Sequence, residues 1–312
     1  MKIIIGGGSG FVGRLLVPAL IDSGSEVTVI GRDKSKILKL FPKQVDAIGW
    51  HELSLLDAAN FDAIINLTGA NIAEKRWSDQ VKAEMISSRV NSVLALIEWC
   101  KKSSGAMPHL YNASAVGYYG LQSAIPENAL LNTEDHFISS LADDSFCCRL
   151  VNEWEATAKI AEKEKIPLTM MRFGVVLHRG EGMLKQLELP AKCGMSAVLG
   201  TGLQPVSWIS ADDLVNAIQF LLAHPEMTGA FNLVAPEIVT QKTFSKSLAA
   251  VVKRPAFMWM PAWLVKLMFG QMGEELLLSG QAVSPSRLLR HDFVFKYPTL
   301  LEALNHEFNK TN

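Results

Sequence analysis

The sequence predicts an α/β fold, in which a doubly wound parallel sheet carries a small C-terminal α/β lobe. Three observations predict it. The chain opens with a short apolar run that leads directly into a cluster of glycines at residues 6–13. Strand patterns then alternate with helical patterns over the first two-thirds of the chain. The 312 residues, 49% of them hydrophobic, suffice for a large core with a smaller part beside it.

The elements of this alternation are read from apolar runs between turn residues. Helices are expected where apolar residues recur at helical spacing, at 11–23, 78–102, 153–163 and 211–223. Strands are expected at 3–5, 26–30, 63–67, 110–113, 168–172 and 230–234, with a weaker one at 45–48. Because most of these strands are apolar throughout, we expect a parallel sheet with helices on its faces.

Charge, cysteine and histidine content exclude several classes of protein. The formal net charge is −1 and the basic residues are scattered, so no nucleic-acid partner is expected. The four cysteines contain no Cys-x-x-Cys pair, which predicts a cytoplasmic protein without a disulfide framework. The seven histidines show no metal-ligand spacing, so no metal is expected. The sequence leaves the oligomeric state open.

The glycine cluster has the spacing of a Rossmann-type dinucleotide loop. Both Gly8-x-Gly10-x-x-Gly13 and Gly7-x-x-Gly10-x-x-Gly13 fit, between an apolar strand and an amphipathic helix. Glycine is needed because the turn is tight and its backbone approaches a pyrophosphate, which the helix N-terminus then holds. The predicted cofactor contacts in this segment are Gly7, Gly10, Phe11, Val12 and Gly13.

The end of the second strand favours NADP(H) over NAD. An acidic side chain usually binds the ribose 2′-hydroxyl of NAD at this place. This chain has Gly31 and Arg32 there, and a guanidinium suits a 2′-phosphate, for which Gly31 leaves room. Asp33 keeps the alternative open, because a shift of one residue would put a carboxylate near the ribose.

The pattern changes after residue 173. Residues 1–173 are predicted to form the dinucleotide-binding domain, and residues 174–312 mainly a substrate lobe. No low-complexity linker separates them, so we expect the two parts to be interleaved. Glycines at 180–182 and 194–202 are interpreted as flexible segments around a substrate cleft.

Residues 256–269 form the most membrane-like stretch of the chain. The stretch is shorter than the ~20 apolar residues that a membrane span needs, and Pro261 and Lys266 interrupt it. No signal-peptide pattern precedes the first strand. We expect a buried helix or the wall of a hydrophobic pocket, with peripheral membrane attachment as the alternative.

Motifs along nearly the whole chain resemble one family in order. They are GGGSGFVG (6–13), NLTGANI (66–72), SSRV (87–90), SAVGYYG (114–120), WE (154–155), RFGVVL (172–177), WISADDL (208–214), FNLVAPE (231–237) and KRPAF (253–257). Together they resemble the extended, atypical short-chain dehydrogenases/reductases, in particular the epimerase family proteins that are similar to nucleoside-diphosphate-sugar epimerases. The resemblance implies further cofactor contacts: Leu67 and Thr68 beside the adenosine, and Glu84 and Arg89 on the following helix.

The resemblance also exposes a departure from the usual chemistry. Typical members of the superfamily use a Tyr-x-x-x-Lys pair, in which the lysine lowers the pKa of the tyrosine that transfers the proton. This chain has no such pair, and counting back from Glu155 places Cys147 and Val151 at the two positions. Ser114 keeps the place that orients a substrate carbonyl, and Tyr118 or Tyr119 could supply a proton; alternatively, all three only shape the pocket.

Two functions follow from this sequence. The first is an NADP(H)-dependent oxidoreductase or epimerase that acts on a small carbonyl, hydroxyl or sugar-derived substrate. The second is a non-catalytic NADP(H)-binding protein that senses redox state or scaffolds a partner. The retained pocket motifs favour the first function, and the absent tyrosine–lysine pair favours the second.

Overall fold

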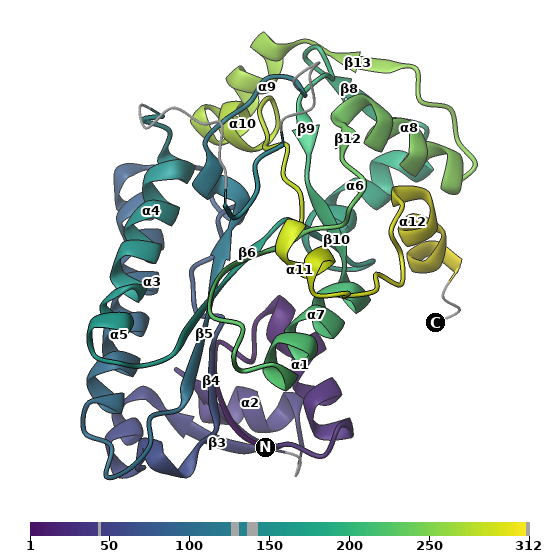
Figure 1. Ribbon diagram of the computed structural model, residues 1–312. Helices are drawn as coiled ribbons and strands as arrows, with labels where there is room; N and C mark the ends of the chain where they lie inside the picture. Colours follow the sequence, from purple (N-terminus) through teal and green to yellow (C-terminus); the bar gives the residue numbers. More distant parts are fainter. Residues whose placement is uncertain (43–44, 126–130, 136–142, 310–312) are drawn as a thin grey trace.

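A seven-stranded parallel sheet forms the centre of the computed structural model, which describes residues 1–42, 45–125, 131–135 and 143–309 (Figure 1). The strand order is β11-β6-β5-β4-β1-β2-β3, the order of a doubly wound nucleotide-binding sheet with one added strand. The strands are β1 (Lys2–Gly6), β2 (Glu26–Gly31), β3 (Asp46–Gly49), β4 (Ala63–Asn66), β5 (His109–Ala115), β6 (Leu168–Phe173) and β11 (Gly229–Leu233).

Helices cover both faces of this sheet, because alternate strand side chains point to opposite sides. Ile3 and Ile5 pack in one core with α1 (Phe11–Asp22), α2 (Lys34–Leu40) and α7 (Ala211–Ala223). Ile4 packs in the other core with α3 (Asp79–Cys100) and α4 (Phe146–Ala158). The short α5 (Ile160–Lys163) and the 3₁₀ turns η1 (Trp50–Leu55), η2 (Ala58–Asn60) and η3 (Val116–Tyr119) complete this part.

The expected fold is confirmed, and one predicted helix is wrong in its bounds. The helix expected at 153–163 begins at Phe146 instead, and it ends at Ala158 before the separate turn of α5. Ser145 caps the true start, where its hydroxyl accepts the backbone N–H of Cys148 at 3.3 Å. The early start places both Cys147 and Cys148 in the first turn of α4.

The chain beyond the sixth strand builds a second core. Helices α6 (Gly182–Lys192), α8 (Gln241–Val251) and α12 (Leu300–Asn309) surround buried apolar side chains such as Trp208 and Phe244. Three strand pairs support them: β7 (Val175–Leu177) with β10 (Trp208–Ser210), β9 (Pro205–Val206) with β12 (Val239–Thr240), and β8 (Ala197–Leu199) with β13 (Met258–Met260). Between these pieces, α7 and β11 return to the main sheet. Part of the glycine-rich stretch 194–202 is therefore regular strand.

The expectation that residues 256–269 are buried is wrong. They form β13 and α9 (Ala262–Phe269), and Val265 is the only residue of α9 that is fully buried. Phe257, Trp259, Trp263 and Leu267 are each more than 60% exposed. Within the described part of the chain, none of the helices is both long enough and apolar enough to cross a bilayer. Two further short helices follow, α10 (Gln271–Leu276) and α11 (Ser286–Arg290).

Candidate functional site

The glycine loop joins β1 to α1 in a shape that only glycines allow. Gly7 has φ +77°, and a Cβ there would lie 2.8 Å from the carbonyl carbon and oxygen of Leu67. The N–H of Gly10 donates to the carbonyl of Gly7 at 2.9 Å, which closes the turn. A Cβ on Gly13 would lie 2.3 Å from the carbonyl oxygen of Gly8, so helix and loop touch there without any side chain between them.

The N-terminus of α1 is open to an anion. Gly10 is the N-cap, and none of the described side chains accepts a hydrogen bond from the backbone of the first turn. The N–H groups of Phe11, Val12 and Gly13 have no acceptor inside the helix, and they carry the positive end of its dipole. This is the arrangement in which helices bind phosphate groups.

Residues of the second core hold this loop from the other side. The guanidinium of Arg14 donates to the carbonyl of Ser9 at 2.9 Å and forms an ion pair with Glu181, just before α6. The ring of Phe11 stacks on that of His178, with their centres 6.0 Å apart. The two parts of the chain thus meet at the loop, and the start of α1 is fixed from both.

At the end of β2, Asp33 is engaged by its own helix. Its carboxylate caps α2 and accepts hydrogen bonds from the hydroxyl of Ser35 at 2.7 Å and the N–H of Lys36 at 3.1 Å. These hydrogen bonds lower the pKa of Asp33. Arg32 is exposed beside it and makes no ion pair with the described residues. A Cβ on Gly31 would lie 2.7 Å from Cδ1 of Ile37, so the strand end packs closely on α2.

Two buried polar atoms next to the loop lack a partner among the described residues: Oγ1 of Thr68 and Nε of Arg89. Thr68 follows Leu67 at the end of β4, and its hydroxyl lies 2.9 Å from where a Cβ of Gly6 would be. The guanidinium of Arg89 packs against Gly69. Orphaned buried donors and acceptors are costly, so their presence beside a glycine loop fits a site for a ribose or phosphate group.

Arg89 is held by neutral partners. Its guanidinium donates to the carbonyls of Met85 at 2.9 Å and Ala70 at 3.1 Å, and it lies over the ring of Trp154 at 5.0 Å. Burial lowers its pKa to about 10, because the environment disfavours the charged form. Glu84, predicted to border the cofactor with Arg89, is exposed on α3.

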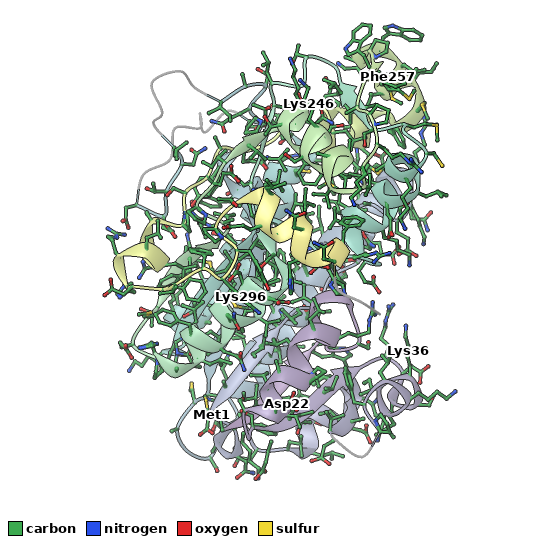
Figure 2. The ribbon with its side chains drawn as sticks, turned by 90° about the vertical axis from the view of Figure 1, so that its right-hand side faces the viewer. Met1, Asp22, Lys36, Lys246, Phe257 and Lys296 are labelled. Atoms are coloured by element: carbon green, nitrogen blue, oxygen red, sulfur yellow. The ribbon has the colours of Figure 1, made fainter. Side chains whose placement is uncertain are left out.

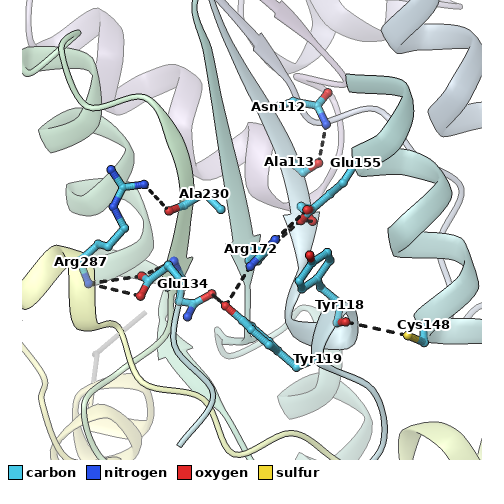
Figure 3. A network of polar contacts seen from close by, with 12 residues as sticks. Asn112, Ala113, Tyr118, Tyr119, Glu134, Cys148, Glu155, Arg172, Ala230 and Arg287 are labelled. Carbon is cyan, nitrogen blue, oxygen red and sulfur yellow. Dashed lines mark hydrogen bonds and ion pairs between the residues drawn. The ribbon is translucent and has the colours of Figure 1, made fainter. Parts of the chain in front are cut away.

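At the carboxyl ends of β5 and β6, a buried ion pair organises a polar network (Figure 3). The guanidinium of Arg172 donates to both carboxylate oxygens of Glu155, at 2.7 and 2.8 Å. Its third nitrogen donates to the hydroxyl of Tyr119 at 2.9 Å, and that hydroxyl donates to Asn232 on β11 at 2.8 Å. Burial acts to lower the pKa of Arg172, but the hydrogen bonds and charge of Glu155 outweigh it and raise the pKa.

This network contains two of the three candidate catalytic residues. The hydroxyl of Ser114 donates to Glu155 at 2.6 Å, and Ser114 is only 2% exposed. Tyr119 is fully buried, and burial raises its pKa to about 12. Tyr118 is partly exposed, and the Arg172 guanidinium lies 3.5 Å from the centre of its ring. Of the three, Tyr118 is therefore the only one with solvent-accessible surface beyond a few per cent.

Counting back from Glu155 assigns the usual tyrosine and lysine to two positions that are buried in the structure. Cys147 and Val151 are buried in α4. The carboxylate of Glu275, on α10, accepts the backbone N–H groups of Phe146 at 3.0 Å and Cys147 at 2.8 Å. Burial, followed by the charge of Glu275, raises the pKa of the Cys147 thiol well above its ordinary value.

Sequence reasoning missed the roles of Glu155, Arg172 and Glu275. Glu155 and Arg172 both lie in motifs of the family resemblance, and Arg172 is the only charged residue in an otherwise uncharged strand. That combination could have indicated a buried pair. Glu134, from the loop 131–135, also joins this region, where its carboxylate accepts from Asn232 N–H at 2.9 Å and Ser286 hydroxyl at 2.6 Å. Glu275 carries no comparable signal, because the N–H groups of Phe146 and Cys147 that it accepts from are far away in sequence.

Comparison with known proteins assigns the chain to a family. A model of the NAD dependent epimerase/dehydratase family matches residues 3–234. The chain belongs to this family. A second model, a domain of unknown function (DUF1731), matches residues 260–307, from the end of β13 into α12. An epimerase family protein of Mycobacterium bovis is 33% identical over 310 residues, which are 97% of this chain and 96% of the relative. One from Staphylococcus aureus N315 is 34% identical over 305 residues, or 97% of each chain.

Solved structures of other epimerase-type proteins share the architecture. The human epimerase family protein SDR39U1 (isoform 2), crystallised with NADPH, superimposes with a TM-score of 0.86 at 29% identity over the full length of both chains. A nucleoside-diphosphate sugar epimerase of Corynebacterium glutamicum has a TM-score of 0.76 at 26% identity, over 99% of this chain and 58% of that one. UDP-glucose 4-epimerase of Thermus thermophilus, at 16% identity and a TM-score of 0.75, shares the fold. The expected family resemblance is thus confirmed.

Proposed function

We propose that this epimerase family protein binds NADP(H) at the carboxyl edge of its sheet. The observation that carries the proposal is the uncapped N-terminus of α1 behind a glycine loop whose Gly7 has φ +77°. Membership of a family named for NAD dependence and the NADPH in the human neighbour support a nicotinamide dinucleotide. Gly7, Gly10, Phe11, Val12 and Gly13 would hold the pyrophosphate.

Residues at the ends of the neighbouring strands would hold the rest of the cofactor. Gly31 and Arg32 would receive the 2′-phosphate of NADP(H), since Asp33 caps α2 and Arg32 is exposed without an ion pair among the described residues. Leu67 and Thr68 would flank the adenosine side, and the unpartnered Nε of Arg89 would bind a ribose or phosphate oxygen. Glu84, which is exposed on α3, would border the cofactor beside Arg89.

The reaction that we propose is oxidation, reduction or epimerisation of a small carbonyl, hydroxyl or sugar-derived substrate. When bound, the cofactor supplies hydride transfer at the nicotinamide. Tyr118, partly exposed beside Arg172, would exchange the proton with the substrate oxygen. Ser114 and Tyr119 would act as positioning residues, because Ser114 donates to Glu155 and Tyr119 anchors Arg172. The lobe formed mainly by residues 174–312 would bind the substrate, in a cytoplasmic protein whose four cysteines are free.

One observation favours a second candidate function. Cys147 and Val151 fill the places of the usual tyrosine and lysine, and Glu275 closes the start of α4 above them. A protein with this arrangement could bind NADP(H) without chemistry, as a redox sensor or scaffold. The two functions share the cofactor site and differ in turnover.

Titration of NADPH and NADH by nicotinamide fluorescence tests the cofactor proposal. The wild type should bind NADPH more tightly than NADH, and Arg32→Ala should weaken NADPH by about 10–100-fold while leaving NADH within twofold, since a charge-assisted contact is worth about 1.5–3 kcal/mol. Lys39→Ala, in the last turn of α2, is the control. An NADH preference, or an unchanged ratio in Arg32→Ala, would contradict the assignment.

A turnover screen over aldehydes, ketones and nucleotide sugars then separates the two functions. Turnover that falls in Tyr118→Phe supports the enzyme. Tight NADPH binding without turnover of any member of a broad panel supports the non-catalytic protein.

A further inference from the structure

An exposed apolar surface lies at the tip of the second core. It consists of six side chains from β13, α9 and the residue before β13, which we call the aromatic patch: Phe257, Met258, Trp259, Trp263, Leu267 and Met268. Phe257 is 78% exposed and Trp259 and Trp263 are 64% and 66% exposed. Isolated exposed apolar residues are common on proteins, but a contiguous group of this kind marks an interaction surface.

The fold keeps the side chains of the aromatic patch exposed to solvent. β13 pairs with β8, and the indole Nε1 of Trp259 donates to the carbonyl of Gly200 at 2.7 Å. The polar atom of this indole is therefore satisfied inside the protein, while the ring faces outwards. On α9, Val265 is fully buried and anchors the helix, so that Trp263, Leu267 and Met268 face away from the core.

The segment around the patch is cationic. Residues 238–273 contain five lysines or arginines and no aspartate or glutamate, in a chain whose formal net charge is −1. Lys266 pairs with Glu274 at 2.6 Å. Lys242, Lys246, Lys253 and Arg254 are exposed and form no ion pair with the described residues. Lys246 and Phe257 lie at the same end of the molecule, opposite Met1 and Asp22 (Figure 2).

We propose that this end of the protein binds the surface of an anionic lipid membrane. Tryptophan and phenylalanine partition to the boundary between headgroups and acyl chains, and lysine and arginine are attracted to anionic headgroups. A second copy of the chain fits less well. A symmetric dimer through the patch would bring each cationic segment against its own copy, with like charges facing each other.

Co-sedimentation with lipid vesicles tests the proposal. The protein should pellet with vesicles of equal parts phosphatidylglycerol and phosphatidylcholine at low salt. It should bind pure phosphatidylcholine much more weakly, and high salt should reduce binding to the anionic vesicles. Quenching of tryptophan fluorescence by brominated phosphatidylglycerol provides a readout without substitutions, because Trp259 and Trp263 are the only exposed residues among the seven tryptophans.

Variants distinguish the apolar contribution to vesicle binding from the electrostatic contribution. Trp259→Ala and Trp263→Ala should each weaken vesicle binding by about tenfold or more, and Lys246→Gln and Lys253→Gln by about fivefold each. Leu55→Ala and Val294→Ala remove apolar side chains that are 80% and 83% exposed outside the patch, and should change nothing. The proposal is overturned if wild-type protein does not bind anionic vesicles, or if binding persists in the double tryptophan variant. It is also overturned if the wild-type protein does not bind vesicles but forms a dimer in sedimentation equilibrium, and the double tryptophan variant is a monomer.

Discussion

The glycine loop and the start of α4 lie at the same edge of the sheet. They differ in how many of the features that the family's chemistry requires each of them has. In the loop, every feature that a dinucleotide needs is present: a positive φ at Gly7, the close approach of Gly13 to Gly8, and an uncapped helix N-terminus. At α4, the carboxylate of Glu275 accepts from the helix N-terminus, and Cys147 and Val151, where the sequence count places the usual tyrosine and lysine, are buried.

Under the proposed function, this difference means that cofactor binding and proton transfer depend on separate features of the fold. The loop depends on backbone shape, so that few substitutions are tolerated without losing the cofactor. Proton transfer depends on two side chains, and these can be exchanged while the helix keeps its place. In this chain, carboxylates at both ends of this region stabilise the position of α4. Glu275 joins α10 to α4, and Glu155 joins α4 to β6.

The largest effect on the free energy of unfolding is expected from a change in the buried ion pair between Glu155 and Arg172. Glu155→Gln removes the charge that Arg172 requires and one of its two strong acceptors, so the free energy of unfolding should fall by about 3–5 kcal/mol. Glu153→Gln, exposed on the same helix, is the control. Urea unfolding measures both, and a loss below about 1 kcal/mol in Glu155→Gln would show that the network does not hold this edge together.

Removal of the carboxylate above Cys147 should have an intermediate effect. Glu275→Gln loses the charge at the N-terminus of α4 and one acceptor for two N–H groups, which should cost about 1–3 kcal/mol of stability. Amide exchange of Phe146 and Cys147 should accelerate. Glu274→Gln breaks only an exposed pair with Lys266 and should cost under about 1 kcal/mol. Equal effects in the two variants would refute the interpretation of Glu275 as a helix clamp.

At neutral pH, the smallest effect is expected at the other end of β5, away from both regions. Burial lowers the pKa of His109 to about 4, from an ordinary value of 6.5. As the pH falls below 6.5, His109 takes up a proton in the unfolded chain, whereas in the folded chain it does so only near pH 4. The free energy of unfolding should therefore decrease as the pH falls from 6.5 to about 4, by at most about 1.4 kcal/mol per pH unit. His109→Gln should flatten the dependence of unfolding free energy on pH. An identical slope in the variant would show that His109 is not the group responsible.

The sequence was sufficient to predict the elements of the main sheet, because short apolar strands and helical spacing are local signals. The start of α4 was placed too late, since its first turn of Phe146, Cys147 and Cys148 offers no strong helix-forming pattern. The six short strands of the second core were not predicted, because their pairing depends on contacts between distant segments.

The candidate site was predictable to the extent that it consists of backbone shape. The glycine loop could be located from its spacing, whereas the partners of Ser114 and Tyr119 are set by distant residues such as Glu155 and Asn232. The hydropathy of the stretch 256–269 predicts burial, but hydropathy measures composition, and composition does not say which side of a segment the fold covers.

The most direct test of the separation between binding and chemistry is one NADPH titration on two variants. Gly7→Ala places a Cβ against Leu67 at a positive φ and should weaken NADPH by at least about tenfold. Cys147→Ala changes the residue that the sequence count places at the usual tyrosine position. This variant should bind NADPH within twofold of wild type, with both variants checked for folding by thermal unfolding. Unchanged affinity in Gly7→Ala, or an equal loss in Cys147→Ala, would contradict the account.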